Sequence, residues 1–209
     1  MTFSIVARDL ETKALGVCVS TAVPAVGSVV PHVEAHVGAI ATQGQTNIRY
    51  GIEGLKLLKS GLSPQAALET MLSNDRDQGK RQVTIIDAQG RTAAFTGKEN
   101  VEWKGHLVRK DYVVAGNMLV GSHVVEAMSR AFETEKGDLA ERLLKSLEAG
   151  DKAGGDKRGR MSAALLVADK RWRSEACPLL DLRVDAHADP VSELRRVHTI
   201  SRKYFQVSE

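Results

Sequence analysis

Thr2-Phe3-Ser4-Ile5-Val6-Ala7-Arg8 is the stretch on which the fold depends, because its side chains alternate in character. Successive side chains of a β-strand point to opposite faces, so the apolar odd-numbered residues share one face and the even-numbered residues share the other. Residues 13–21 form a second predicted strand, and the polar segment 9–12 is typical of a hairpin connection. The chain is therefore expected to open with two antiparallel strands.

Further strands and helices follow in clusters. Predicted strands cover residues 27–32, 38–43, 81–88, 91–97, 111–117, 162–168 and 179–185. Helical spacing of apolar residues marks segments near residues 52–61, 64–72, 124–132, 139–147 and 190–205, with a flexible loop expected at 150–160. Ser63 precedes Pro64, and Asp189 precedes Pro190, which is the arrangement of an N-cap followed by a first-turn proline. Strands and helices in such clusters predict an α+β fold, an antiparallel sheet core covered by helices, in one domain of residues 1–209.

Composition excludes several classes of protein. The 209 residues carry a net charge of only +3 and 4% aromatic side chains, so neither a basic surface nor a base-stacking platform for nucleic acid is expected. The N-terminus lacks the basic and apolar regions of a secretory signal, and no apolar run approaches the length of a membrane span, so we expect a cytoplasmic protein. Cys18 and Cys177 are then expected to be reduced, with Cys18 in the core.

Six ordered blocks carry a resemblance that covers nearly the whole chain. They are residues 2–9, 25–31, 82–97, 115–121, 154–160 and 178–185. These blocks resemble the prokaryotic domain-of-unknown-function family ten twenty-eight. The resemblance implies a four-layer αββα sandwich similar to that of the Ntn (N-terminal nucleophile) hydrolases, which cleave amide bonds. Met161 departs from the family pattern, in which a Gln is expected at this position.

Thr2 is the candidate nucleophile. Removal of Met1, which is common before a small second residue, leaves a hydroxyl and a free α-amine on one residue, and that amine titrates near 7.7–8.0. The amine is then able to take the hydroxyl proton during attack on an amide. Asn117 and the Gly116 backbone are predicted to stabilise the oxyanion. The alternative is that Thr2 simply begins an edge strand, where β-branched residues are favoured.

Two serines and one loop are predicted to contribute to substrate binding. Ser28 is a further possible donor, and Ser4 lies on the same face of the first strand as Thr2. In Gly154-Gly155-Asp156-Lys157-Arg158-Gly159-Arg160, glycines permit close backbone approach, and Arg158 and Arg160 suit a carboxylate or phosphate. Asp156 belongs to the same predicted site. The alternative is a solvated surface loop whose charges serve solubility.

Metal and cofactor sites are not predicted. His32 and His36 are four residues apart but lie in an extended, proline-led segment, and zinc sites gather three or four ligands at recognisable spacing. The spacing of a phosphate-binding loop is also absent. The basic residues of the last segment suit the solvated face of a helix.

Two functions remain open at this point. The first is an Ntn-type amide hydrolase that acts on a small amide or amino-acid derivative. The second is a non-catalytic metabolite-binding or assembly protein that keeps the same fold. In both cases we expect a small-molecule ligand, and the predicted edge strands favour a homodimer.

Overall fold

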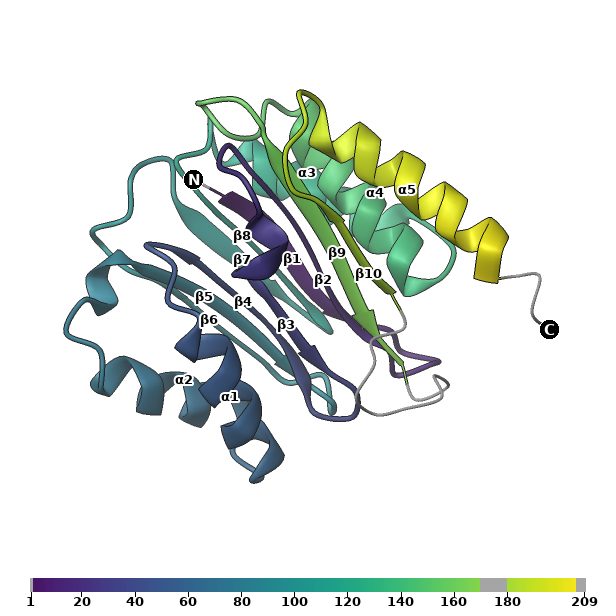
Figure 1. Cartoon of the computed structure of the whole chain (residues 1–209). Helices are drawn as coiled ribbons and strands as arrows, with labels where there is room; N and C mark the ends of the chain where they lie inside the picture. Colours follow the sequence, from purple (N-terminus) through teal and green to yellow (C-terminus); the bar gives the residue numbers. More distant parts are fainter. Residues whose placement is uncertain (1, 170–179, 206–209) are drawn as a thin grey trace.

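The computed structural model describes residues 2–169 and 180–205, and across these residues strands and helices alternate in clusters (Figure 1). The strands are β1 (Thr2–Arg8), β2 (Leu15–Thr21), β3 (Pro31–Glu34), β4 (Gly38–Gly44), β5 (Arg81–Asp87), β6 (Thr92–Thr96), β7 (Gly105–Arg109), β8 (Tyr112–Asn117), β9 (Ser162–Ala168) and β10 (Leu180–Val184). The helices are α1 (Arg49–Lys59), α2 (Pro64–Ser73), α3 (His123–Thr134), α4 (Leu139–Lys152) and α5 (Pro190–Phe205), with short 3-10 turns η1 (Val26–Ser28) and η2 (Gln78–Lys80).

The strands form two antiparallel sheets. The first has six strands in the order β10-β9-β2-β1-β8-β7, and the second has four in the order β3-β4-β5-β6. The opening hairpin of the chain therefore occupies the middle of the larger sheet, and β1 pairs with β2 on one side and β8 on the other. The predicted α+β class and the antiparallel core are confirmed.

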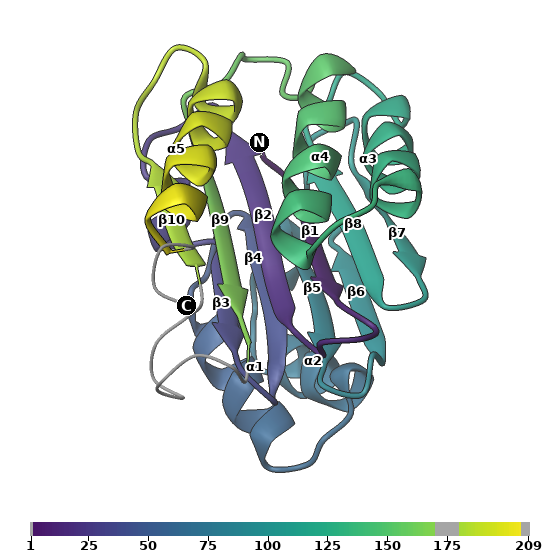
Figure 2. The same cartoon turned by 90° about the vertical axis from the view of Figure 1, so that its right-hand side faces the viewer.

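Each sheet has one face covered by helices, and the remaining faces pack against each other. Figure 2 shows α3, α4 and α5 lying over the six-stranded sheet. Phe3 and Ile5 belong to the apolar cluster beneath those helices, whereas Val6 belongs to the cluster between the two sheets. A third cluster, including Ile40 and Leu68, lies between the four-stranded sheet and helices α1 and α2. The alternation predicted for residues 2–8 is thus confirmed, and it directs Thr2 and Ser4 toward the space between the sheets.

Three local predictions were wrong. Residues 26–28 form η1 instead of the start of a strand, because Ala25 adopts a left-handed φ of 57° and the Ala25 carbonyl accepts hydrogen bonds from Ser28. Strand β7 is not among the strands that the sequence predicts. Helix α4 continues through Gly150, where the sequence predicts a loop. The missing Cβ of Gly150 lets α4 pack closely against α3, since a Cβ there would come within 2.7 Å of the Met128 Cγ.

Ser63 caps α2 as predicted. Its hydroxyl oxygen accepts a hydrogen bond of 3.2 Å from the Ala66 backbone N–H, and Pro64 occupies the first turn. We expect Ser63→Ala to lower the free energy of unfolding by about 1 kcal/mol, because it leaves that N–H without its side-chain acceptor. Ser60→Ala, which removes a hydroxyl at the C-terminal end of α1, is the control, and chemical denaturation compares the two. Equal stability of the two variants would contradict the capping role.

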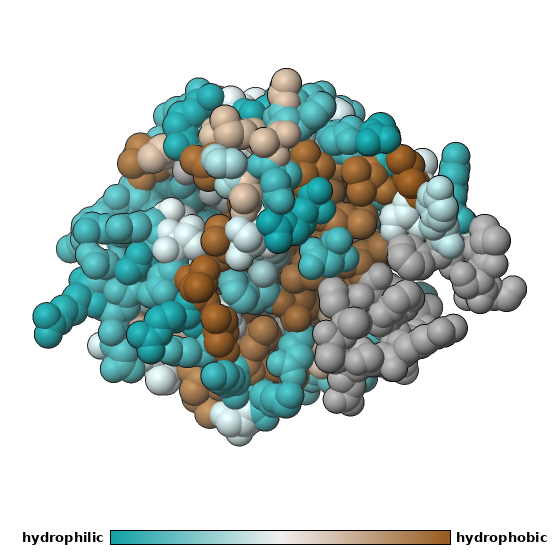
Figure 3. Space-filling view, viewed as in Figure 1, coloured by the Kyte–Doolittle hydropathy of each residue, from teal (hydrophilic) through white to brown (hydrophobic). Residues whose placement is uncertain are grey.

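Apolar side chains reach the surface on the face seen in Figure 1. Hydrophobic residues gather there in a band across the middle, between the two groups of helices (Figure 3). Within the described ranges, no helix combines the length and the apolar character needed to cross a bilayer. Cys18 is fully buried in the core, and this burial raises the pKa of its thiol, whereas Cys177 lies outside the described residues.

Candidate functional site

Thr2 occupies the N-terminal end of the central strand β1. It pairs with Thr21 of β2 on one side and with Asn117 of β8 on the other. Only 6% of Thr2 is exposed, and its hydroxyl donates a hydrogen bond of 3.2 Å to the Thr21 hydroxyl. The alternative that Thr2 begins an edge strand is therefore wrong, because β1 has a neighbour on both sides.

Gln43 connects Thr2 and Ser4 to the opposite sheet. The Ser4 hydroxyl donates to the Gln43 Oε1 at 2.8 Å, and the Gln43 Nε2 lies 3.5 Å from the Thr2 carbonyl oxygen. Ser4 and Gln43 are almost completely buried. Because buried amides must find partners, this pair fixes how the start of β1 faces β4.

Gln82 of β5 is the centre of a larger buried network. Its Oε1 accepts from the Gln43 Nε2 at 2.8 Å and from the Asn117 Nδ2 at 2.9 Å. Its Nε2 donates to the Gly116 carbonyl at 2.8 Å and to the Gly105 carbonyl at 3.0 Å. One fully buried side chain thus connects β4, β5, β7 and β8, which belong to two different sheets.

The network continues to a histidine. Thr96 of β6 accepts from the Gln82 Nε2 at 2.9 Å, and its hydroxyl oxygen lies 2.8 Å from the His106 Nδ1. Either the Thr96 hydroxyl donates to an unprotonated His106 Nδ1, or a protonated Nδ1 donates to the Thr96 oxygen, depending on the tautomer of the ring. Burial lowers the pKa of His106, which favours the neutral ring.

Asn117 is the member of the network that borders open space. A cavity of about 300 Å³ is lined by Gly44, Gln45, Lys80, Glu99, Asn100, Val101, Asn117 and Met118. The Asn117 Nδ2 carries two hydrogens, of which one goes to Gln82, and among the described residues no acceptor holds the second. An amide hydrogen next to a cavity and directly across from Thr2 is suited to bind a ligand oxygen.

Gly116 and Ser28 do not have the surroundings that a hydrogen-bond donor to a substrate requires. Gly116 lies inside the sheet, paired with Phe3 and Gly105, and its carbonyl is an acceptor for Gln82. Ser28 is exposed on η1, and its hydroxyl donates to the Ala25 carbonyl at 2.7 Å. Thr2, Ser4, Gly116 and Asn117 are therefore brought together, whereas Ser28 is not part of this network.

The glycine-rich loop packs against the ends of β2 and β8. Asp156 forms a bridge with Leu119, and its buried carboxylate accepts from the Ala22 backbone N–H at 3.2 Å. Arg158 contacts the same carboxylate at 3.4 Å. Arg160 instead pairs with Asp151 and lies 3.5 Å from Asp189, so the two arginines do not converge on one ligand here.

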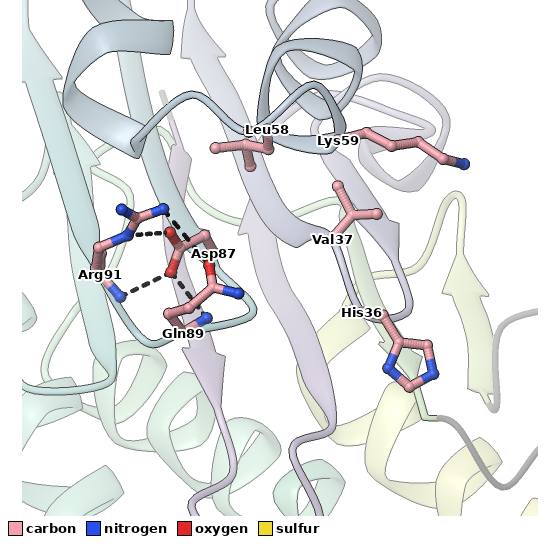
Figure 4. Close-up of a pocket in the computed structure, with 8 residues that line it drawn as sticks. His36, Val37, Leu58, Lys59, Asp87, Gln89 and Arg91 are labelled. Atoms are coloured by element: carbon pink, nitrogen blue, oxygen red, sulfur yellow. Dashed lines mark hydrogen bonds and ion pairs between the residues drawn. The ribbon is translucent and has the colours of Figure 1, made fainter.

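Another cavity lies away from these residues. Its volume is about 520 Å³, and Figure 4 shows it between the β3–β4 turn, the end of α1 and the β5–β6 turn. Asp87 and Arg91 form an ion pair of 2.6 Å beside it. Gly38 pairs with Asp87, whereas Gly44 pairs with Arg81, so this cavity is at the opposite end of the four-stranded sheet from Gln43 and Thr2.

Sequence reasoning missed most of the buried network that Thr2 faces. Thr21, Gln43, Gln82, Thr96 and His106 were not among the predicted site residues. A signal was present, because Gln43 and Gln82 are amides inside otherwise buried strands, and buried polar groups call for partners. Among the described residues, no group of three His, Cys, Asp or Glu side chains is arranged to hold a metal ion.

Comparisons with known proteins give a family and two solved structures. The model of the "Family of unknown function (DUF1028)" matches residues 2–194. The crystal structure of protein SPO2555 from Silicibacter pomeroyi, of the same family, is 34% identical with a TM-score of 0.88, over 96% of this chain and 88% of that chain. Anbu (ancestral beta-subunit) from Yersinia bercovieri is 9% identical with a TM-score of 0.46, over 99% of this chain and 97% of that chain. No curated protein matches the sequence. The match of the family model over most of the chain establishes that this protein belongs to the family of unknown function DUF1028.

Proposed function

We propose that this protein is an Ntn-type amide hydrolase whose nucleophile is the hydroxyl of Thr2 at the start of the mature chain. The observation that carries the proposal is the position of Thr2: at the tip of a central strand, facing a buried amide network that borders a cavity. The order of helices, sheet, sheet and helices supports the further proposal of a four-layer αββα sandwich in one domain, as the resemblance to Ntn hydrolases implies.

The proposed first step is acylation of Thr2. The free α-amine accepts the hydroxyl proton while the Thr2 Oγ1 attacks the substrate carbonyl carbon, which gives a tetrahedral oxyanion. The second hydrogen of the Asn117 Nδ2 donates to that oxyanion. When the C–N bond breaks, the α-ammonium returns its proton to the leaving amine, and an ester on Thr2 remains.

The second step releases the acyl group. Water attacks the ester carbonyl, the α-amine takes a proton from the water, and the same ammonium then protonates the departing Thr2 oxygen. The products are a carboxylic acid and the original hydroxyl. Thr21 is proposed as a positioning residue, because its hydroxyl accepts from the Thr2 hydroxyl at 3.2 Å.

The cavity beside Asn117 supports a small substrate. Its volume of about 300 Å³ is at the lower end of ligand pockets. Lys80 and Glu99 give it one charge of each sign, which suits an amino-acid derivative with both an ammonium and a carboxylate group. The predicted homodimer stays a prediction.

Two preparations that differ by one residue test the proposal. In the first, tag cleavage leaves Thr2 as the N-terminal residue, and in the second a single glycine precedes Thr2, so the nitrogen of Thr2 is a peptide nitrogen. We expect amine release from a panel of amino-acid amides by the first preparation and at least about 100-fold less by the second, since the amine base is lost. Intact mass verifies both preparations.

Two other results of this experiment would contradict the proposed mechanism or favour the second candidate function. Equal turnover by both preparations would rule out the α-amine as the base. If neither preparation turns over any amide, but a ligand raises the melting temperature and is recovered unchanged, the protein is a metabolite-binding protein that keeps the fold.

A further inference from the structure

Asp156 lies beyond the Thr2 end of strand β1, on the line along which this strand would continue. Strands β2 and β8 lie on either side of β1, so they are roughly 10 Å apart at this end. Asp156 reaches both: its backbone forms a bridge with Leu119, two residues after β8, and its carboxylate accepts from the N–H of Ala22, the residue after β2.

The direction of the Ala22 N–H fixes the side on which the carboxylate lies. The Thr21 carbonyl accepts from the Met161 N–H at 2.8 Å, so it points toward β9. Across a trans peptide bond the carbonyl and the following N–H point in opposite directions. The Ala22 N–H therefore points toward the line of β1, and the Asp156 Oδ2 that accepts it lies in that line.

We propose that Asp156 is the positioning residue for the α-amine of Thr2. Its carboxylate accepts a hydrogen bond from an N–H of this amine, and the bond holds the amine lone pair toward the Thr2 hydroxyl. This inference deepens the proposed function and rests on Thr2 being the N-terminal residue. The carboxylate is suited to the task because only 1% of its side chain is exposed, and solvent therefore screens it little.

Arg158 moderates the effect of this carboxylate. A carboxylate favours the ammonium form of a neighbouring amine and raises its pKa, whereas a cation has the opposite effect. Arg158 contacts Asp156 through its guanidinium at 3.4 Å and through its backbone N–H at 2.7 Å. The two side chains therefore act on the pKa of the amine in opposite directions.

The other elements around Thr2 contribute few charges. Its neighbours Thr21, Asn117 and Gln43 are uncharged. Across the cavity beside Asn117, Lys80 and Glu99 are of opposite sign, and Lys80 also pairs with Asp77 at 2.8 Å. Asp156 and Arg158 are therefore the charged pair expected to dominate the titration of the amine.

The experiment is a pH titration of the Thr2 amine without substrate. Protein that begins at Thr2 is labelled with 13C-threonine, and NMR follows the Thr2 carbon signals, which are identified with a Thr2→Ser variant. We expect Asp156→Asn to lower the titration midpoint by about one pH unit and Arg158→Ala to raise it. Asp181→Asn, an exposed residue on β10 with the same change of net charge, is expected to leave the midpoint unchanged.

The outcomes separate this inference from the proposed function. An unchanged midpoint in both variants overturns the role of Asp156, even where the enzyme is active. If Asp156→Asn fails to fold, the exposed Arg158→Ala decides alone, and a midpoint equal to that of the parent protein overturns the inference. Shifted midpoints without turnover of any amide leave the inference standing and contradict the hydrolase.

Discussion

Thr2→Ala, in a chain that begins at residue 2, is expected to abolish amide hydrolysis, with turnover reduced at least about 1,000-fold. The substitution removes the oxygen that forms the ester, and no other hydroxyl is positioned with its own α-amine. The fold should be retained, because within the described part of the chain the Thr2 side chain makes one hydrogen bond, to Thr21, at the end of β1. Steady-state kinetics of amine release, together with a thermal melt, measures both properties.

Thr2→Ser is the matched control for this loss. Serine keeps the hydroxyl and the α-amine and removes only a methyl group, so we expect it to retain turnover within about 10-fold of the parent, well above that of Thr2→Ala. Hydrolysis that survives in Thr2→Ala at the parent rate would mean that the reaction occurs at another site, or that a contaminating enzyme performs it.

Gln82→Leu is expected to cause the largest loss of stability, about 3–4 kcal/mol, because it removes the centre of the buried network while keeping a similar volume. Gln43 and Asn117 lose their common acceptor, and the carbonyls of Gly105 and Gly116 lose a donor. Each buried group left without a partner costs about 1–3 kcal/mol. For a chain of this length, such a loss lowers the melting temperature by roughly 10 °C.

An exposed glutamine offers the control for Gln82. Gln65 lies on the surface of α2, and among the described residues its side chain bonds only to Glu69, four residues later. Gln65→Leu should change stability by less than about 0.5 kcal/mol. Urea denaturation compares the two variants, and a similar midpoint for both would show that the inter-sheet amides do not hold the sheets together.

Much of the fold could be predicted because its signals are local. Alternation in residues 2–8 gave the face of each residue in β1, and Ser63 with Pro64 gave the start of α2. Strand β7 was missed because its residues, from Gly105 to Arg109, carry no clear alternation of buried and exposed positions. The η1 turn was missed because a left-handed backbone at Ala25 has no signal in the side chain itself.

The candidate site could be predicted only in part, because its partners meet across two sheets. Thr2, Ser4 and Asn117 share a face through strand geometry, and that much follows from sequence once the pairing is known. Gln43 and Gln82 come from the other sheet, and their contacts with β1 and β8 depend on how the sheets stack. Long charged side chains are the hardest to place, as Arg160 shows by pairing with Asp151.

The central place of β1 in its sheet has a consequence for biosynthesis. The first strand to leave the ribosome cannot gain its second neighbour until residues 112–117 have been made, which at about 5–20 residues per second takes at least roughly 6 s. During this interval the amino terminus of the nascent chain is still open to the aminopeptidase that removes initiator methionine. For Thr2 as the proposed nucleophile, this order places the removal of Met1 before the burial of Thr2 between its two neighbouring strands.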